Sequence, residues 1–408
     1  MSSHAHPKPA PLEIKFWTPG VLVLFAVMLI GVCFIIARYL GGLAVVTNLD
    51  NQHPWGLWIG IDVATGVALA AGGFTTAAIA HVFGRHQYEA VTRPALLTAT
   101  LGYTFVAIGL AIDVGRSWAL PKPLLFWQGN SVLFEVAMCV VVYTHVLYIE
   151  FVPIVVERFR GKVNLPGPFS LLNDRLEHLL AIAEGILDKT MWVFIIAGVV
   201  LSCMHQSGLG SLMLIAPTKL HPLWYTPILP LLFLTSAIAA GYPMVVFETT
   251  VATASFKRAD EMEVLAPLTG VTKYLLGIYI TLKIGDMIFR ETYVYLFDGS
   301  IESRSFIVEM LAMIIPWFML MSQNLRKKRH TLFVACTTIV LGIALNRCNV
   351  FLIGFSPPYA VKSYFPSISE MAITACLLCS ITFFYRLAVT YLPVLSAPSL
   401  ASMEKEPS

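Results

Sequence analysis

Apolar stretches long enough to cross a bilayer recur along almost the whole chain, separated by short segments rich in charged residues, Pro and Gly. A bilayer core about 30 Å thick needs a helix of about 20 apolar residues. Ten such stretches cover residues 18–40, 57–82, 94–118, 131–154, 190–210, 226–254, 270–294, 305–323, 331–347 and 369–391. The pattern therefore predicts an all-α integral membrane protein with about ten transmembrane helices.

The composition agrees with a location in the membrane. Hydrophobic residues make up 57% of the chain and charged residues only 12%, whereas soluble domains carry about 25% charged residues. Within 408 residues the apolar stretches leave no segment long enough for a separate soluble domain. We therefore expect one subunit of a larger assembly, surrounded by membrane lipids and without nucleic-acid partners.

Basic residues in the connecting segments predict the orientation, because Lys and Arg near the ends of spans are retained in the cytoplasm. With the N-terminus inside, most of them lie in inner loops, including the basic run 326–329. The outer loops hold mainly Arg38, Lys122, Lys219, Arg304 and Lys362. We therefore expect both termini in the cytoplasm. The first stretch has no small-residue cleavage site, so we expect it to remain as an anchor.

The longest inner loop, residues 157–189, has leucines at helical spacing with charges between them. This spacing is typical of an amphipathic helix that lies on a membrane surface. We expect such a helix on the cytoplasmic face, where it would link two helix bundles.

Cysteine and histidine limit the cofactors that this chain could hold. The seven cysteines are scattered, and Cys376-x-x-Cys379 lies in an apolar stretch. Iron–sulfur and zinc sites need clustered ligands, so we expect no cluster and no metal here. Haem b needs two histidines at one depth; only His81 and His145 could approach each other, since His205 is near the outer end of the fifth stretch. A haem b anchor remains an alternative.

Four charged residues share one depth near the outer ends of the second, third and fourth stretches. Asp62, Asp113, Arg116 and Glu135 each lie about one helical turn inside the expected boundary. Their burial is costly unless they pair or line a wet cavity. One interpretation is a clamp between helix ends, in which Asp113 and Arg116 pair. The other is a pocket whose acids exchange protons with a lipid-soluble molecule, for which a quinone fits best.

Several short strings carry a resemblance to a known family. They are His53 to Asp62 (HPWGLWIGID), Gly72-Gly73, Arg93-Pro94-Ala95, Asp113-Val114-Gly115-Arg116, Asn130 to Glu135 (NSVLFE), Met204-His205-Gln206-Ser207 and Gly210 to Met213 (GSLM). In these strings and in its ten-span layout the chain resembles the HybB-type membrane subunits of the NrfD/PsrC superfamily.

The resemblance implies two four-helix bundles, formed by spans two to five and six to nine, with spans one and ten flanking them. It divides the chain into a tail (1–17), an anchor and outer loop (18–56), a first bundle (57–212), a second bundle (213–348), a last loop and helix (349–395) and a second tail (396–408). It also implies the inner membrane of a bacterium, menaquinone as the substrate and no haem in this chain.

The same resemblance implies partners and site residues. A periplasmic iron–sulfur subunit would deliver electrons, with a hydrogenase large and small pair, or a multihaem cytochrome and molybdopterin-like subunits, beyond it. The chain would thus act in a quinone reductase only together with partners. The implied quinone site comprises Asp62, His205, Glu135, Asp113 and Arg116. Asp62 and His205 would hydrogen-bond the headgroup, Glu135 would exchange protons, and Asp113 with Arg116 would shape the site.

Two further groups of ionisable residues lie inside the spans. His145, Glu150, His81 and Tyr143 occupy the cytoplasmic half of the first bundle and are candidates for a proton pathway, although a neighbouring helix could simply satisfy His145. The second bundle contains Lys283, Asp286, Arg290, Glu309 and Glu248, which form either a structural ion-pair network or a second proton route. A proton-coupled transporter and a purely structural anchor are the rival functions.

Overall fold

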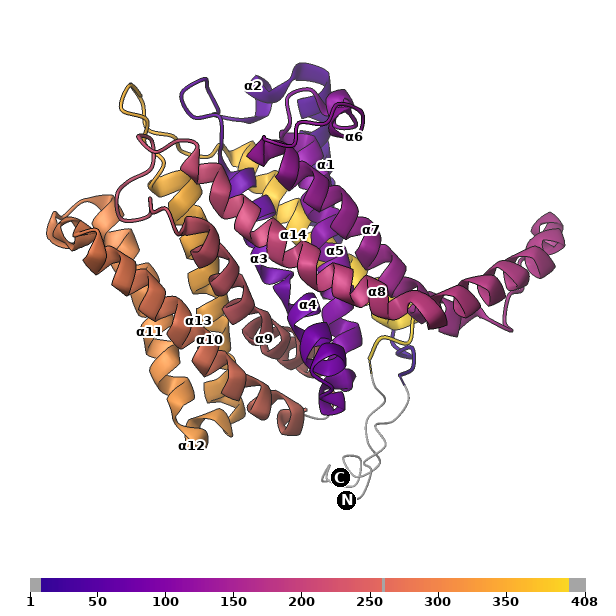
Figure 1. Ribbon diagram of the computed structural model, residues 1–408. Helices are drawn as coiled ribbons and strands as arrows, with labels where there is room; N and C mark the ends of the chain where they lie inside the picture. The colour runs from indigo at the N-terminus through magenta and orange to yellow at the C-terminus, as the bar shows by residue number, and fades with distance from the viewer. Residues whose placement is uncertain (1–8, 259–260, 396–408) are drawn as a thin grey trace.

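The computed structural model describes residues 9–258 and 261–395, and ten long helical spans dominate it (Figure 1). The described residues contain no β-strand, and an isolated bridge joins Leu220 to Phe355. The all-α membrane architecture expected from the apolar pattern is confirmed. The spans are α1 (Pro19–Gly41), the second span Trp58–Val82, α5 (Glu89–Asp113), α7 (Val132–Phe159), α8 (Asn173–Leu214), α9 (Leu229–Ser255), α10 (Met262–Phe289), α11 (Ile301–Met321), the ninth span Arg329–Ile353, and α14 (Ile368–Tyr391).

Two spans are built from several helical segments. The second consists of the π-helix η1 (Trp58–Thr65), α3 (Gly66–Leu69), α4 (Ala71–Ala77) and the π-helix η2 (Ala78–Val82). The ninth consists of α13 (Arg329–Cys348) and the π-helix η7 (Asn349–Ile353). The remaining elements are short: α2 (Leu43–Val46), η3 (His86–Tyr88), η4 (Ser117–Ala119), α6 (Lys122–Leu125), η5 (Gly167–Leu172), η6 (Thr292–Phe297) and α12 (Gln323–Arg326).

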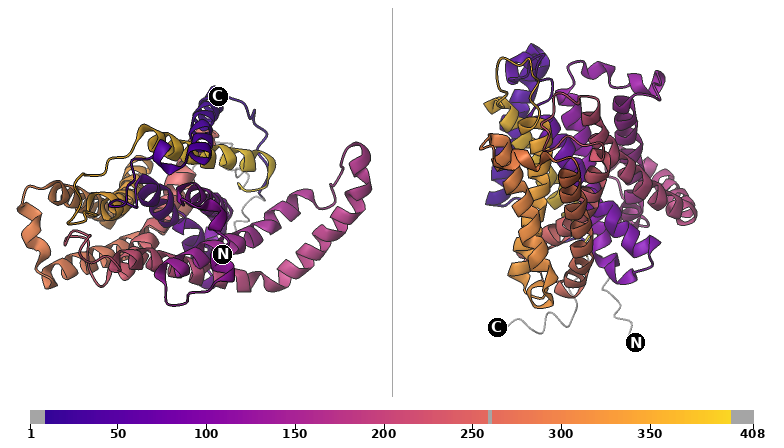
Figure 2. Two further views of the ribbon diagram at one scale, coloured as in Figure 1. Left: turned by 90° about the horizontal axis from the view of Figure 1, so that it is seen from above. Right: turned by 60° about the vertical axis from the view of Figure 1, so that its left-hand side comes forward.

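The spans pack into two groups of four, with one pair beside them (Figure 1; Figure 2). In the first group α4 and α7 both pack against α5 and α8. In the second, α9 and α11 both pack against α10 and α13. Helices α1 and α14 pack against each other, and α14 also contacts α5 and η1. The first and last spans therefore form a hairpin-like pair on the flank of the first bundle.

The two bundles meet where α4 crosses α9, and glycine allows this close approach. A Cβ on Gly241 would lie 2.3 Å from the Thr75 hydroxyl oxygen, and one on Gly72 would lie 3.2 Å from the Gly241 carbonyl oxygen. Small residues let membrane helices approach closely enough for van der Waals packing. The hydroxyl of Tyr242 also donates to the Thr75 carbonyl at 3.3 Å. The second span is therefore enclosed by both bundles.

Helix η1 has π geometry because its backbone hydrogen bonds reach back five residues, and the side chain of Thr65 forms a hydrogen bond over the same interval. The Gly66 amide donates to the Ile61 carbonyl, and the Thr65 hydroxyl donates to the Gly60 carbonyl at 2.8 Å. Single π turns inside membrane helices are frequent at functional sites. Asp62 lies in this segment.

The amphipathic segment differs from the expectation. Residues 173–214 form one continuous helix of 42 residues, so the amphipathic part is the first half of α8 and not a separate surface helix. It projects beyond the bundles together with the end of α7 (Figure 1). Arg160 forms an ion pair with Glu184, and the Gly161 amide donates to Glu177 at 3.1 Å. These contacts join α7 and α8, which belong to the same bundle, so the segment does not link two bundles. The helix continues through Gly185, and no Pro lies between its halves.

Two further spans begin and end earlier than the apolar pattern predicts. Helix α5 covers Glu89–Asp113 where residues 94–118 were expected, and α10 covers Met262–Phe289 where residues 270–294 were expected. In α5 the chain leaves the helix at Val114, whose backbone is extended. Hydropathy alone does not detect such local turns.

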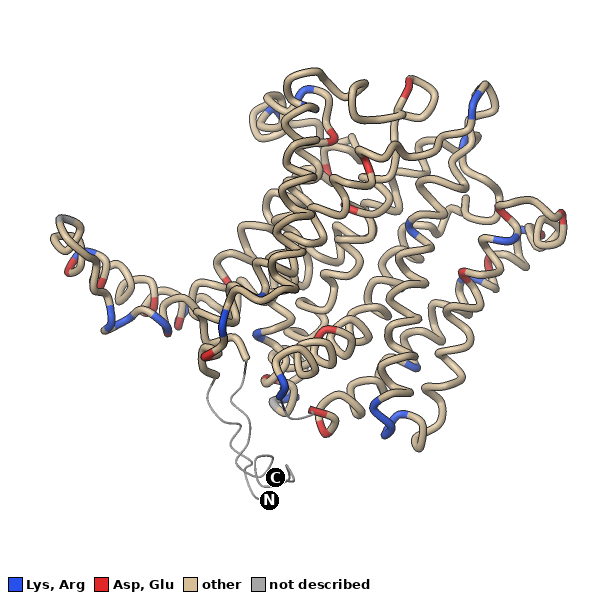
Figure 3. The backbone as a smooth tube through the Cα atoms, turned by 180° about the vertical axis from the view of Figure 1, so that it is seen from behind, with Lys and Arg blue, Asp and Glu red and all other residues tan. Residues whose placement is uncertain are grey.

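The first and last described segments lie at the same end of the bundles. The Ala10 amide donates to the Leu395 carbonyl at 3.2 Å, and the Leu12 amide donates to the Val389 carbonyl at 3.0 Å. We call this end, with the loops 83–88, 160–172 and 322–328, the terminal face, and the opposite end the distal face. The basic run 326–329 belongs to the terminal face, while few charges lie between the two faces (Figure 3).

Candidate functional site

Asp62 is held between three spans close to the distal face. Its side chain is buried, and Oδ2 accepts a hydrogen bond of 2.8 Å from the Thr374 hydroxyl of α14. The other oxygen, Oδ1, is buried without a hydrogen-bond partner among the described residues. Gly109 of α5 lies next to this side chain, since a Cβ there would be in van der Waals contact with the Asp62 Cβ at 3.5 Å. A buried polar atom without a partner indicates a site for a ligand or water.

An apolar pocket of about 280 Å³ opens beside Asp62. Asp62 is the only ionisable side chain among the described residues that line it. Leu378, which also lines it, is 52% exposed, so the pocket reaches the lipid-facing surface of α14. Its volume is near the lower end of the range usual for small-molecule sites. The walls come from the second span, α5, α9 and α14, chiefly Ile61, Phe105, Val106, Met244, Phe247 and Leu377.

Asp113 and Arg38 lie directly on the distal side of this pocket. Asp113 is one helical turn beyond Gly109 on α5, and Asp62, Glu370 and Arg38 are its charged neighbours. The buried Arg38 guanidinium of α1 donates to the Ile112 carbonyl at 2.7 Å and to the Val114 carbonyl at 2.6 Å. A cation at the carboxyl end of a helix is stabilised by the exposed carbonyls. Arg38 therefore caps α5 next to the two aspartates.

Glu370 organises the distal loops around the site. It accepts hydrogen bonds from the Tyr364 hydroxyl, from the Asn48 amide at 3.0 Å and from the Ser367 amide at 2.8 Å. Burial raises the pKa of the Tyr364 hydroxyl well above its ordinary value, and the hydrogen bond to Glu370 acts in the same direction. The sequence pattern Ser367-x-x-Glu370 is a capping box. That motif was the available signal for Glu370, which sequence reasoning missed.

His205 lies inside the first bundle, away from the Asp62 pocket. Its Nδ1 is 3.1 Å from the Tyr103 hydroxyl, and the rings of Tyr103 and Tyr143 pack edge to face at 4.5 Å. The neighbouring Gln206 donates to the Val67 carbonyl at 2.7 Å. Four buried polar atoms here have no hydrogen-bond partner among the described residues: Tyr143 Oη, Ser202 Oγ, His205 Nε2 and Gln206 Oε1. The bundle interior thus contains a polar chain with free hydrogen-bonding capacity.

Besides His205, two more of the five residues expected at the quinone site lie elsewhere. Glu135 is exposed and lines a separate groove between α7 and α8 together with Met138 and Met204. Arg116 is exposed, and within the described chain it forms no ion pair with Asp113. The helical i, i+3 spacing fails because α5 ends at Asp113. The structure therefore brings Asp62 and Asp113 together, but not Glu135, Arg116 or His205.

The four residues expected to form a proton pathway are also divided. Tyr143 is buried in the bundle, and Glu150 packs against α8, where a Cβ on Gly198 would lie 2.6 Å from its Oε1. His145 and His81 are exposed, and His145 Nδ1 lies 2.7 Å from the Val141 carbonyl of its own helix. Glu150 and Tyr143 are two turns apart on one face of α7, whereas His145 points away from them.

In the second bundle Glu309 is the centre of a saturated buried network. Lys283 forms an ion pair with it, and Asn346, Asn349 and Trp224 each donate a hydrogen bond of 2.8–2.9 Å. The buried Arg347, which sequence reasoning missed, lies 3.7 Å above the Phe233 ring and donates to Asn346. Every oxygen of Glu309 therefore has two donors, as a stable buried ion pair requires.

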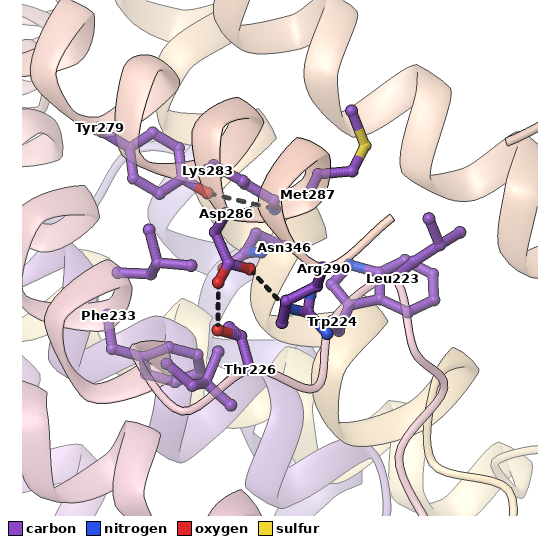
Figure 4. A pocket seen from close by; sticks show the side chains of 12 residues that line it. Leu223, Trp224, Thr226, Phe233, Tyr279, Lys283, Asp286, Met287, Arg290 and Asn346 are labelled. Atoms are coloured by element: carbon purple, nitrogen blue, oxygen red, sulfur yellow. Dashed lines mark hydrogen bonds and ion pairs between the residues drawn. The ribbon is translucent and has the colours of Figure 1, made fainter. Parts of the chain in front are cut away.

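Asp286 and Arg290 form a separate branch nearer the distal face (Figure 4). Arg290 donates to Asp286 at 2.9 Å, and so does the Thr226 hydroxyl at 2.7 Å. The cavity between this branch and Lys283 measures only about 10 Å³, which is the size of one water. Glu248 does not join either group, because it lies between α5, α9 and α14 in a second large pocket.

The histidines weighed as haem ligands do not fit a bis-histidine site. His81 and His145 are exposed on two different spans, while His205 is fully buried beside Tyr103. None of the three larger pockets, those beside Asp62, Glu248 and Glu135, is lined by a histidine. Among the described residues, no group of three or more His, Cys, Asp or Glu side chains could hold a metal ion.

Comparison with known proteins gives a consistent family. Residues 45–356 match the family model of NrfD, polysulphide reductase. A protein of Nitratidesulfovibrio vulgaris is 36% identical over 388 residues, which cover 93% of this chain and 95% of that protein. The probable Ni/Fe-hydrogenase 2 b-type cytochrome subunit of Escherichia coli is 34% identical, with 95% of each chain covered.

A more distant relative bears a name that refers to menaquinone. It is the menaquinone reductase integral membrane subunit of Nitratidesulfovibrio vulgaris, 24% identical over 94% of this chain and 92% of that protein. The family match covers most of the ten-span region and the relatives extend along nearly all of it. The chain therefore belongs to the polysulphide reductase NrfD family of integral membrane proteins.

Proposed function

We propose that this chain is the quinone-binding membrane subunit of a respiratory oxidoreductase complex, and that the pocket beside Asp62 binds the quinone headgroup. The observation that carries the proposal is the buried, unpartnered Oδ1 of Asp62 at the edge of an apolar pocket that reaches the lipid. A quinone needs a hydrogen-bonding group at a carbonyl oxygen and apolar walls around its ring. The name of the menaquinone reductase relative supports menaquinone as the substrate.

Reduction of a quinone to a quinol consumes two electrons and two protons. The electrons come from a partner subunit with iron–sulfur clusters that docks on the distal face, since the headgroup pocket lies at that end. The Asp62 carboxyl donates a hydrogen bond and then a proton to the nearer carbonyl oxygen, and water delivers the second proton to the other carbonyl oxygen. Thr374 holds Oδ2 so that Oδ1 points toward the substrate. In this scheme Asp113 and Arg38 set the charge around the pocket mouth.

The basic terminal face supports a cytoplasmic position for that face, because Lys and Arg are retained inside. The Asp62 pocket would then lie near the periplasmic side of the inner membrane. Electron entry from a periplasmic hydrogenase or multihaem cytochrome complex fits this orientation. The E. coli relative is named as a hydrogenase subunit, which supports the first of these donors.

Protons would reach the site from the cytoplasm through the interior of the first bundle. Glu150 lies nearest the terminal face, followed by Tyr143, then Tyr103 with His205, and finally Gln206, which contacts Val67 of the second span. Four unpartnered polar atoms along this chain provide hydrogen bonds for intervening water. His145 and His81 have no part in this revised path, since both are exposed.

Photolabelling with an azidoquinone tests the location of the headgroup. The full chain in lipid nanodiscs would be irradiated with the probe, digested and mapped by mass spectrometry. We expect labels on residues 61–70 and 377–382, and competition by excess menaquinone. Specific labels in the groove beside Glu135, or around Lys283 and Glu309, would refute the assignment. Labelling of an Asp62→Ala variant provides the matched control, because loss of the headgroup contact removes competable label from the same peptides.

A further inference from the structure

A second pocket adjoins the Asp62 pocket on its terminal side. It has a volume of about 470 Å³ and lies between α1, α9 and α14. Both pockets are lined by Thr98, Met244, Phe247, Ile381 and Thr382. The two cavities therefore adjoin, and we treat them as two sections of one groove that begins at Asp62 near the distal face and runs along α14 toward the terminal face.

The walls of the second pocket are mainly apolar. Leu24 of α1, Val251 and Phe247 of α9, and Ile381 of α14 surround its middle. Its polar lining includes Glu248 of α9, whose Oε1 is buried without a hydrogen-bond partner among the described residues. At the terminal end Arg386 donates to the Lys15 carbonyl at 2.7 Å and to the Phe16 carbonyl at 3.2 Å. The guanidinium is thus occupied by the chain itself and is not free for a charged ligand.

We propose that this second pocket binds the isoprenoid tail of the quinone whose headgroup lies at Asp62. The inference rests on the proposed function and extends it to a second subsite of the same ligand. The position of this pocket next to the headgroup pocket indicates its ligand. A hydrocarbon chain attached to a quinone ring beside Asp62 would extend into this apolar pocket. Burial of each methylene group of such a chain contributes to affinity.

In this proposal the two flanking helices, α1 and α14, form walls of the tail subsite. Helix α1 packs against α14 and α2, and only 11% of its most apolar window is buried. It forms one wall of the groove through Gly20, Val21 and Leu24. Spans one and ten, which belong to neither bundle, therefore determine which tail the site accepts.

Two positions allow the groove to be filled at different points along its length. Thr98 lines both pockets and lies at their junction. At Gly20, near the end of the groove, no atom lies within 4 Å of an added Cβ. The variants Thr98→Phe and Gly20→Phe therefore introduce a ring into the junction and the far end respectively. Thr98→Val preserves volume, and Gly285→Phe places the same ring at another open glycine in α10, so these two are matched controls.

The test measures binding of two quinones to the full chain in nanodiscs by quenching of tryptophan fluorescence, with protein-free nanodiscs as the partition control. One probe is tailless 2,3-dimethyl-1,4-naphthoquinone and the other is menaquinone-4. We expect Thr98→Phe and Gly20→Phe to weaken menaquinone-4 binding by at least about tenfold. Binding of the tailless quinone should remain within about twofold of wild type, and both controls should bind like wild type.

Unchanged menaquinone-4 affinity in both filled variants would overturn the tail subsite and leave the groove to a membrane lipid. Equal loss of both quinones in both variants would overturn it as well, because the effect would not depend on the tail. A second headgroup site at Glu248 would make binding of the tailless quinone sensitive to Glu248→Gln, which is a third contradicting result. A failure of the proposed function gives a different result from a failure of the tail subsite. In that case wild type and Asp62→Ala would bind the tailless quinone equally well.

Discussion

The Thr374 hydroxyl donates a hydrogen bond of 2.8 Å to Oδ2 of Asp62, which links the last membrane helix to the π-helical start of the second span. The two residues are 312 positions apart in the sequence. Since α14 lies outside both bundles, a flanking helix sets the orientation of a carboxylate in the first bundle. The arrangement leaves Oδ1 available beside the apolar pocket.

Removal of this hydrogen bond should destabilise the protein. Thr374→Val keeps the shape of the side chain but leaves both oxygens of a buried carboxyl without a donor. We expect the free energy of unfolding to fall by about 1–3 kcal/mol. Denaturant titration in mixed micelles measures the change, and Thr374→Ser, which retains the hydroxyl, should stay close to wild type. Equal stability of the Val and Ser variants would show that the hydrogen bond is not made.

The ion pair between Lys283 and Glu309 should behave as a structural element. Lys283→Met leaves a buried carboxylate with one partner fewer, and we expect a loss of about 3–5 kcal/mol. The double variant Lys283→Met with Glu309→Gln removes both charges and should recover part of this loss. Unfolding titrations of the two single variants and the double variant give the coupling energy. If the losses of unfolding free energy in the two single variants simply added in the double variant, Lys283 and Glu309 would not act as a structural ion pair.

The interior tyrosines should affect proton transfer and not quinone binding. Tyr143→Phe removes a buried hydroxyl from the proposed proton chain, so quinone reduction by the assembled complex should slow by about tenfold or more. The dissociation constant of the quinone should not change. Tyr148→Phe is the matched control on the same helix, because the Tyr148 side chain is 43% exposed and its hydroxyl contacts Thr104 outside the bundle interior. Equal rates in both variants would exclude Tyr143 from the path.

Alkaline pH should reveal the hydrogen bond between Tyr364 and Glu370. The folded-state pKa of Tyr364 is raised by burial and by this hydrogen bond, whereas the unfolded chain ionises near pH 10. Above pH 10 the unfolded state releases a proton that the folded state keeps, so stability falls as pH rises. We expect the thermal midpoint to drop between pH 9 and about pH 11, and to drop less in Tyr364→Phe. If the thermal midpoints of wild type and Tyr364→Phe fell equally with rising pH, the raised pKa of Tyr364 would be contradicted.

The positions of the spans could be predicted from the sequence because length and hydropathy are local properties. The depth of Asp62 and Asp113 followed in the same way, by counting residues from the boundaries. The direction of a side chain around its helix could not be predicted, because lipid-facing and bundle-facing sides are both apolar in a membrane helix. Glu135 and His145 therefore appeared to belong to the interior, although both are exposed.

Long-range partners were equally hidden from sequence reasoning. Thr374, Glu370 and Tyr364 reach the second span and its preceding loop from more than 300 residues away. The pocket itself also depends on α9 of the other bundle, which contributes Met244 and Phe247. The hydrophobic periodicity of one span does not predict contacts with a distant span. The site forms only because α9 and α14 pack against the first bundle.

Binding of a menaquinone analogue to the purified full chain tests the central claim most directly. Fluorescence quenching would be measured for wild type, Asp62→Ala and Glu135→Gln, after circular dichroism and gel filtration have shown that each is folded. Loss of a hydrogen bond from the headgroup should weaken binding by about tenfold in Asp62→Ala. Glu135→Gln should bind like wild type, because Glu135 lines a different groove. Wild-type affinity in Asp62→Ala would contradict the assignment of the quinone to this pocket.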